Sequence, residues 1–223
     1  MRYDNTVLTG ADPVLHPDRG WDGIMNDEIL CSTREFLLLE TYDEMRENGY
    51  RGASLNRIAE RAGLTKGSLY HYFPSKTHLG CAVIDEVIGA RIRRDWLDSL
   101  QRAGNPIVAL QRSIRREIKQ FSLDLRERRL NSLHFLIEMS YLDDRLQKRY
   151  VALQTHWLRE MERALRRGVT TGLLRPDIQP RRISLLLLTT LLGAATVALI
   201  AGDARLFRNQ MNEVSDRLRG LLA

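Results

Sequence analysis

Residues 49–79 read GYRGASLNRIAERAGLTKGSLYHYFPSKTHL, and this stretch decides the fold. Ser54, Thr65 and Ser75 each precede a run of helical spacing, and their hydroxyls can cap the free amides of a helix start. Gly63 breaks the chain between the first two runs, and a Phe-Pro pair breaks it before the third. Two short helices joined by a tight glycine turn and packed against a third helix form a helix-turn-helix.

The charge of this stretch favours a polyanionic partner. Residues 51–80 contain five basic side chains and one acidic side chain, a net charge of +4. The whole chain of 223 residues has a formal net charge of +6. A basic balance suits nucleic acid or an anionic membrane surface, and helix amino termini near Ser54 and Thr65 suit phosphate oxygens.

The second short helix is the part that we expect to meet DNA bases. Thr65, Lys66, Gly67 and Ser68 lie at its start, the part of a recognition helix that reaches base edges. Lys66 can reach a guanine edge or a phosphate, and Ser68 is short enough to touch a base. Gly67 removes a side chain where the backbone must approach the groove wall.

The same residues resemble the DNA-binding domain of the TetR family of transcriptional regulators. The resemblance covers the Gly49-Tyr50 pair, the helix capped by Ser54, the Ala62-Gly63 turn and the run from Thr65 to Lys76. It implies phosphate contacts from Tyr70, His71 and Lys76, with Asn56 and Arg57 as secondary candidates; His71 as a solvated surface residue and Tyr70 as half core remain alternatives. The predicted DNA-binding residues are Ser54, Asn56, Arg57, Thr65, Lys66, Gly67, Ser68, Tyr70, His71 and Lys76.

Beyond the N-terminal extension the rest of the chain is predicted to be helical, which makes the fold class all-α. A capping box at Ser32 and Glu35 starts the helix that precedes the motif, and Gly49 ends it. Apolar residues recur at helical spacing to the end of the chain, with no alternating strand pattern. We expect a loose extension over 1–24 and a DNA-binding domain over 25–78, and the family resemblance implies that the helices of 79–223 form a ligand-binding and dimerisation domain.

The family resemblance implies that this second domain senses a small-molecule effector. Its identity is not readable from the sequence, because any apolar helices can enclose a pocket. Each aromatic candidate is also a candidate for plain core, and the arginines at 91, 93, 94, 112, 115 and 116 suit either an anionic effector or a solvated helix face. The predicted pocket residues are Trp96, Phe121, Phe135, Met139, Tyr150 and Trp157.

Residues 183–202 carry no charge and are long enough to cross a bilayer. We expect burial inside the domain and against a second subunit instead, because the rest of the chain is charged amphipathic helix. The resemblance implies a homodimer built by two long helices from each subunit, near 145–171 and 180–201. Two recognition helices would then lie roughly 34–36 Å apart, so the double-stranded operator should be a near-palindrome.

The sequence argues against catalysis and metal binding, since it has no phosphate-binding glycine loop, no nucleophile elbow and no metal-ligand spacing. No cofactor is expected. Cys31 and Cys81 fit a reducing cytoplasm, and a redox role for either stays open. Our interpretation is a dimeric cytoplasmic transcription regulator, released from DNA by its effector, with repression more common in the family than activation. The alternatives are a DNA-binding dimer without an effector and a membrane-anchored protein.

Overall fold

The computed structural model of the chain describes residues 32–130 and 132–223. The extension predicted over 1–24 and Cys31 lie outside the described residues. Within the described ranges all named elements are helices, and one isolated bridge joins Leu174 to Leu222. The all-α prediction is confirmed.

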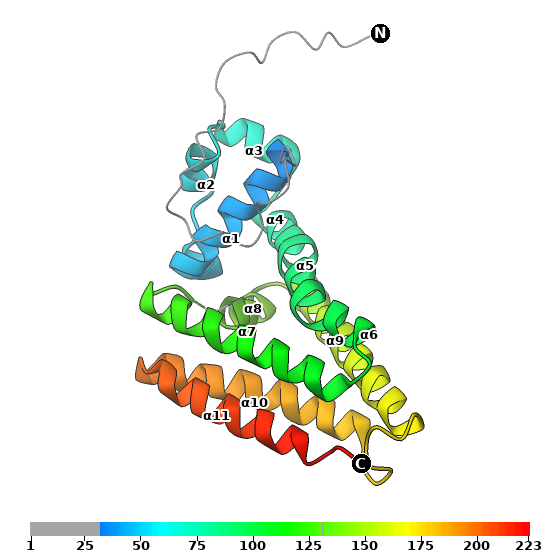
Figure 1. Cartoon of the computed structure of the whole chain (residues 1–223). Helices are drawn as coiled ribbons and strands as arrows, with labels where there is room; N and C mark the ends of the chain where they lie inside the picture. Colours follow the sequence, from blue (N-terminus) through cyan, green and yellow to red (C-terminus); the bar gives the residue numbers. More distant parts are fainter. Residues whose placement is uncertain (1–31, 131) are drawn as a thin grey trace, which may run out of the picture.

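Three helices at the top of Figure 1 form the helix-turn-helix: α1 (Thr33–Gly52), α2 (Leu55–Arg61) and α3 (Lys66–Tyr72). The predicted capping box is present, since the Glu35 carboxylate accepts from the Ser32 backbone amide at 2.8 Å. Gly49 interrupts α1 with a φ of +71°, a conformation that side chains with a Cβ rarely adopt. The chain therefore turns at Gly49 before it enters α2.

A long bent helix descends from this unit. It begins after the Ser75 cap, whose hydroxyl accepts from the His78 amide at 3.2 Å, and runs to Arg102 with two π-helical stretches. Such stretches are rare and often mark functional sites. Its parts are α4 (Lys76–Ala82), η1 (Val83–Ile88), α5 (Gly89–Ile92), η2 (Arg93–Leu97) and α6 (Asp98–Arg102).

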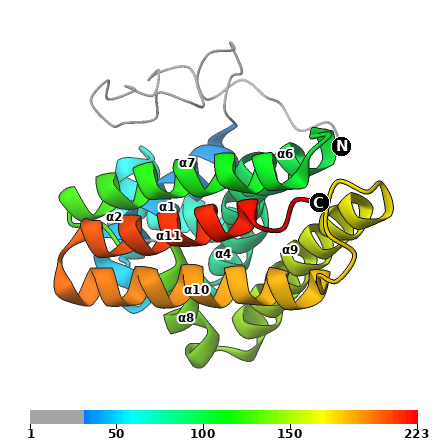
Figure 2. The same ribbon diagram turned by 60° about the horizontal axis from the view of Figure 1, so that its bottom comes forward.

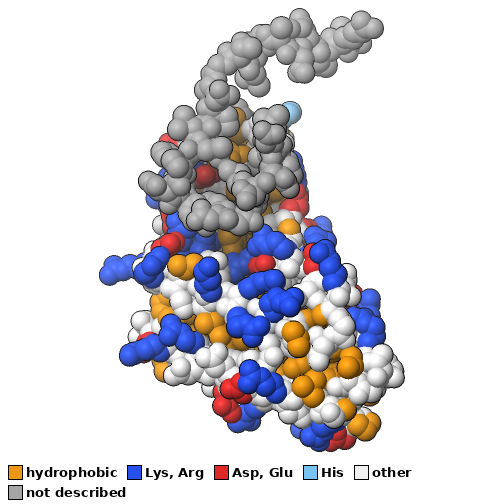
Figure 3. Space-filling model, in the orientation of Figure 1, with side chains coloured by type: hydrophobic (Ala, Val, Ile, Leu, Met, Phe, Trp, Pro, Cys, Tyr) orange, Lys and Arg blue, Asp and Glu red, His pale blue; other side chains and the backbone are white. Residues whose placement is uncertain are grey.

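The lower half is built from long helices, and many Lys and Arg side chains lie on the face of it that Figure 3 shows. In Figures 1 and 2, α7, α10 and α11 lie side by side as one layer, and α9 crosses beside the long bent helix. Phe121 of α7 stacks on Phe207 of α11, with ring centroids 4.3 Å apart. The bounds are α7 (Pro106–Arg126), α8 (Ser132–Leu142), α9 (Asp144–Thr170), α10 (Pro180–Ala201) and α11 (Ala204–Arg219).

The described residues pack into two hydrophobic clusters, and α8 belongs to the upper one. Phe135, Leu136 and Met139 of α8 join the core that holds the helix-turn-helix, where the Phe135 ring meets the Tyr42 ring edge-on at 5.8 Å. Leu146 and Tyr150 of α9 join the same cluster. Apolar packing therefore continues across residue 78, where the sequence places a domain limit.

Helix α10 is the one helix of the described ranges that is long and apolar enough to cross a membrane, and a third of its most apolar window is buried. One face packs on α9 and α11. The other face exposes Leu185, Leu186, Val197 and Ile200, the last to 82%. A single subunit therefore leaves a largely apolar stripe on this helix uncovered, with Thr189 and Gly193 exposed between its two ends.

Candidate DNA-binding surface and effector pocket

The start of α3 is open to solvent and fixed by its own cap. The Thr65 hydroxyl accepts from the Ser68 amide at 3.1 Å and lies 2.9 Å from the Ser68 hydroxyl. Lys66 and Gly67 are exposed, while Leu69 is fully buried beneath them. A Cβ at Gly67 would meet nothing closer than 3.7 Å, so the free protein tolerates a side chain there. The requirement for glycine is then expected only against DNA.

The other end of α3 presents aromatic side chains. Tyr70 and Tyr72 are each 40% exposed, and His71 is exposed with its ring edge-on to Tyr72 at 5.9 Å. Tyr70 is therefore partly open to solvent while part of its ring stays covered, and its phosphate contact stays a prediction. Tyr72 lies in the run that resembles the family but was not among the predicted contact residues, and its exposure makes it an additional candidate.

Three charged side chains hold the connection between α1 and α2. The fully buried Glu44 carboxylate accepts from the Ser54 amide at 3.0 Å and from Arg57 at 2.6 Å. Lys76 donates to the carbonyls of Arg51 and Ala53 at 3.1 and 2.6 Å. Glu44 and Lys76 therefore fix the point where α2 begins.

Ion pairs neutralise part of the basic face that the sequence predicts. Arg57 pairs with Glu44, and Arg61 pairs with Glu47 at 2.8 Å, so two of the five local cations are matched by carboxylates of α1. Among the described residues, Arg51 and Lys66 form no ion pair, and both are exposed. The counted charge of +4 overstates the free positive charge near α3.

Lys76 has a structural role beyond the predicted phosphate contact. Its ammonium lies 5.0 Å from the centre of the Tyr50 ring as well as on the two carbonyls. Burial lowers the pKa of Lys76, and the nearby carboxylates of Glu138 and Glu44 partly offset this. An ammonium has three donors, so one N–H remains for a phosphate. Two further predicted DNA-binding residues lie at the start of α2: Ser54 is half-buried and Asn56 is exposed.

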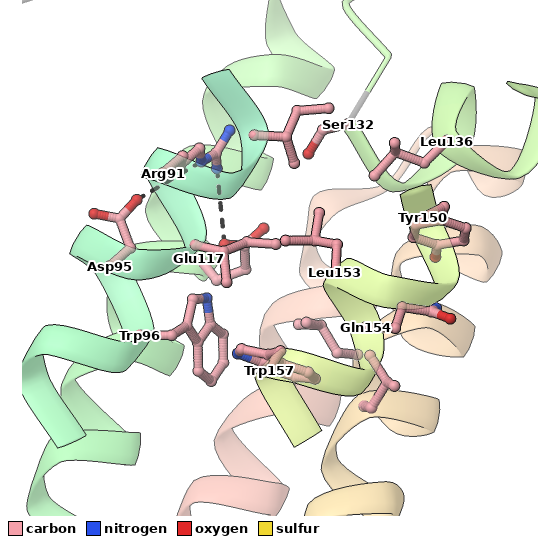
Figure 4. Close-up of a pocket in the computed structure, with 14 residues that line it drawn as sticks. Arg91, Asp95, Trp96, Glu117, Ser132, Leu136, Tyr150, Leu153, Gln154 and Trp157 are labelled. Atoms are coloured by element: carbon pink, nitrogen blue, oxygen red, sulfur yellow. Dashed lines mark ion pairs between the residues drawn. The ribbon is translucent and has the colours of Figure 1, made fainter. Parts of the chain in front are cut away.

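A pocket lies between the long bent helix, α7, α8, α9 and α10 (Figure 4). Its volume is about 60 Å³, enough for a few water molecules or a small ligand group. Trp96 and Trp157 form one end, edge-on at 5.2 Å. The lining residues are Ile88, Arg91, Ile92, Asp95, Trp96, Glu117, Ser132, Leu136, Tyr150, Leu153, Gln154, Trp157, Leu188 and Leu191.

Half of the predicted pocket residues line this cavity. Trp96, Tyr150 and Trp157 do so. Phe121, Phe135 and Met139 do not, because they are fully buried in the two cores on other faces of their helices. Helical spacing shows that a side chain is buried, but only tertiary packing decides whether it meets a cavity.

Sequence reasoning named Arg91 as a candidate for an anionic effector but missed Asp95 and Glu117, which lie beside it on the polar wall of the pocket. Arg91 lies 3.7 Å from both Asp95 and Glu117, and it donates to the Tyr42 hydroxyl of α1 at 3.1 Å. Burial opposes its charge, but Tyr42 and Glu117 outweigh that effect and raise the pKa of Arg91. The four-residue spacing of Arg91 and Asp95 was the available signal. It could not show that the pair faces inward.

The described ranges offer few side chains for a metal site or a redox site. No group of three His, Cys, Asp or Glu side chains there could hold a metal ion. Cys81 is a half-buried free thiol, and burial raises its pKa. A raised pKa makes a thiol less reactive at neutral pH.

Known protein families match both the N-terminal and the C-terminal part of the chain. Residues 37–82 match the family described as "Bacterial regulatory proteins, tetR family", and residues 132–214 match "Tetracyclin repressor-like, C-terminal domain". A curated relative, the HTH-type transcriptional repressor DhaR of Mycobacterium sp. (strain GP1), is 26% identical over 161 residues, which are 72% of this chain and 79% of that protein. The repressor NemR of Escherichia coli (strain K12) is 34% identical over 70 residues, 31% of this chain and 35% of its own.

Solved structures share the fold. The crystal structure of reduced E. coli NemR superposes with a TM-score of 0.71 at 23% identity, covering 86% of this chain and 98% of that one. A TetR-family regulator from Rhodococcus sp. has a TM-score of 0.70 at 18% identity, with 86% and 98% covered. Together with the geometry of α1 to α3, these matches show that the chain belongs to the TetR family of DNA-binding transcriptional regulators.

Proposed function

We propose that this regulator is a cytoplasmic repressor that binds a near-palindromic operator as a homodimer and leaves it when a small molecule enters the pocket of Figure 4. The observation that carries the proposal is the start of α3, where Lys66 and Gly67 stand exposed on a rigid cap. Such a short helix can place its first residues against base edges in a major groove. In this proposal residues 25–78 form the DNA-binding domain and residues 79–223 form the ligand-binding and dimerisation domain.

The apolar stripe of α10 supports the dimer. Leu186, Val197 and Ile200 recur at helical spacing, and Gly193 between them has open space where a Cβ would lie. A second copy of α10 can therefore approach closely and cover the stripe, which hydrophobic burial favours. The α9 part of the predicted interface has weaker support, since its exposed side chains are mostly basic, such as Arg159 and Arg163.

Effector release follows from linkage between two binding sites. Arg91 lines the pocket and also bonds to Tyr42 on α1, so a ligand that engages Arg91 changes a contact of the helix-turn-helix. If the effector and the operator favour different arrangements, each weakens the binding of the other. The small volume of the pocket favours the alternative of a DNA-binding dimer without an effector. Thermal melting of the protein with a compound library finds candidate effectors, and testing whether those compounds release the protein from its operator separates the two hypotheses.

Replacing Lys66 by alanine is expected to weaken specific operator binding by at least about 30-fold, because one good base contact is worth about 1–3 kcal/mol and a twofold dimer loses one in each half-site, about 2 kcal/mol or more in total. Titration of a fluorescent duplex at fixed salt measures the effect. Lys119→Ala removes an exposed lysine from α7, outside both α3 and the predicted dimer helices, and should leave affinity unchanged. Equal affinities for the parent and Lys66→Ala would remove Lys66 from the interface.

The functional proposal is tested by genomic selection of bound duplexes. The purified protein should enrich a small set of fragments that share a near-palindrome, and a reporter gene placed behind one of them should be silenced when the protein is present. Enrichment of no sequence over random competitor would refute the proposal, and increased reporter expression would show activation instead.

A further inference from the structure

The break in α1 exposes two backbone amides that are satisfied by α8, a helix distant in the sequence. After Gly49 leaves the helical conformation, the amides of Tyr50 and Arg51 point out of α1. The Glu138 carboxylate of α8 accepts both, at 2.7 Å from Tyr50 N to Oε2 and at 3.0 Å from Arg51 N to Oε1. A charged acceptor that spans two amides makes a strong and directional contact.

The contact is closely fitted. A Cβ on Gly49 would lie 2.8 Å from Glu138 Oε2, so the carboxylate occupies the space beside the break. Among the described residues, Glu138 forms no ion pair, and both of its oxygens are spent on these amides. The side chain therefore acts as an anion cap on the α1 break.

Helix α8 also forms a wall of the pocket. Ser132 and Leu136 line the cavity, as Figure 4 shows, whereas Glu138 lies two residues beyond Leu136 and so projects from a different face. One rigid helix thus contacts both the pocket and the segment that leads into α2. The segment itself runs only from Gly49 to Ser54 before α2 begins.

We infer that Glu138 is a positioning residue for DNA binding: by holding the amides of Tyr50 and Arg51, it sets the placement of α2 and α3 relative to α8. The inference rests on the proposed function for its biological meaning. Glu138 would touch no DNA, and a ligand that shifts α8 would shift the helix-turn-helix through these two bonds.

The sign of the effect makes the test sharp. Removing an acidic side chain near a DNA-binding surface should tighten DNA binding if only long-range electrostatics acts. Loss of a positioning contact should weaken it. For Glu138→Ala we expect a loss of about tenfold in affinity for the selected operator, with an unchanged salt slope because no phosphate contact is removed. Glu138→Gln keeps one acceptor oxygen, so its affinity for the operator should lie between that of Glu138→Ala and that of the parent.

Hydrogen exchange of the full-length protein without DNA provides the second measurement. The amides of Tyr50 and Arg51 should exchange at least tenfold faster in Glu138→Ala, while amides in the middle of α9 keep their rates. The control is Glu213→Gln, which removes a carboxylate charge paired with Arg217 on the surface of α11, outside the predicted dimer helices, and should change neither readout.

The outcomes are separable. Unchanged exchange at both amides, or operator binding by Glu138→Ala that equals or exceeds the parent's, overturns the inference. If the parent protein selects no operator at all, the proposed function fails, and the exchange rates still decide whether Glu138 holds the break. Faster exchange together with weaker operator binding supports the positioning role.

Discussion

Replacing Val197 by aspartate is expected to convert the dimer into monomers and to lower operator affinity by more than about 100-fold. Val197 is 59% exposed in the single subunit, so the change leaves the monomer core intact. In a twofold interface the substitution places two carboxylates in an apolar contact, where burial of an unpaired charge costs several kcal/mol. One helix-turn-helix alone keeps only half of the DNA contacts. Sedimentation at micromolar concentration, combined with duplex titration, measures both effects.

The matched control is Val108→Asp, since Val108 is 45% exposed at the start of α7. It should remain dimeric and bind the operator like the parent. A Val197→Asp variant that sediments as a dimer would show that the stripe of α10 has another role. Val151→Asp, on the outer face of α9, then tells whether that helix shares the interface.

The second large effect concerns stability and the Asp124 carboxylate. Asp124 is buried at the end of α7, where it pairs with the buried Arg46 of α1 and accepts from Gln120 at 2.7 Å. Arg46 has a second carboxylate, Asp43, at 3.4 Å. Asp124→Ala is expected to lower the free energy of unfolding by about 3 kcal/mol, because removal of one partner leaves a buried charge poorly compensated.

For a chain of this size that loss corresponds to a fall in Tm of about 6–12 °C. Calorimetry at a fixed protein concentration measures it, because association also affects the melting of a dimer. Asp177→Ala removes an exposed carboxylate paired with Arg175 and should change Tm by less than about 2 °C. Equal Tm values for the two variants would contradict the assigned role of the Arg46–Asp124 pair.

Helix starts and stops were predictable because their signals are local. Ser54, Thr65 and Ser75 cap the helices that follow them, and Gly63 has the left-handed φ of +66° that the turn requires. Each of these features depends on residues within four positions, so the order of elements could be read from the sequence alone.

Charge at the site was less predictable, because opposite charges came from another helix. Arg57 and Arg61 pair with Glu44 and Glu47, which stand on α1 outside the counted stretch. Lys76 likewise turned out to hold two carbonyls of the α1–α2 connection. A window of sequence counts charges but cannot show which of them are already paired.

The pocket and the link to α8 were beyond sequence reasoning for a related reason. Burial of Phe121 and of Trp157 looks identical in a helical pattern, yet only Trp157 meets the cavity. Glu138 follows Tyr50 by 88 residues, and nothing in its neighbours indicates that it caps a break in α1. Such contacts exist only once the helices are packed.

The central claim is that two copies of α3, related by a twofold axis, read one operator. The most direct measurement is the affinity for the selected operator after insertion of about 5 base pairs, half a helical turn, between its half-sites. Because the insertion rotates one half-site to the opposite face of the duplex, we expect specific binding to fall to the level of random DNA. Affinity that is indifferent to the spacing would contradict the claim.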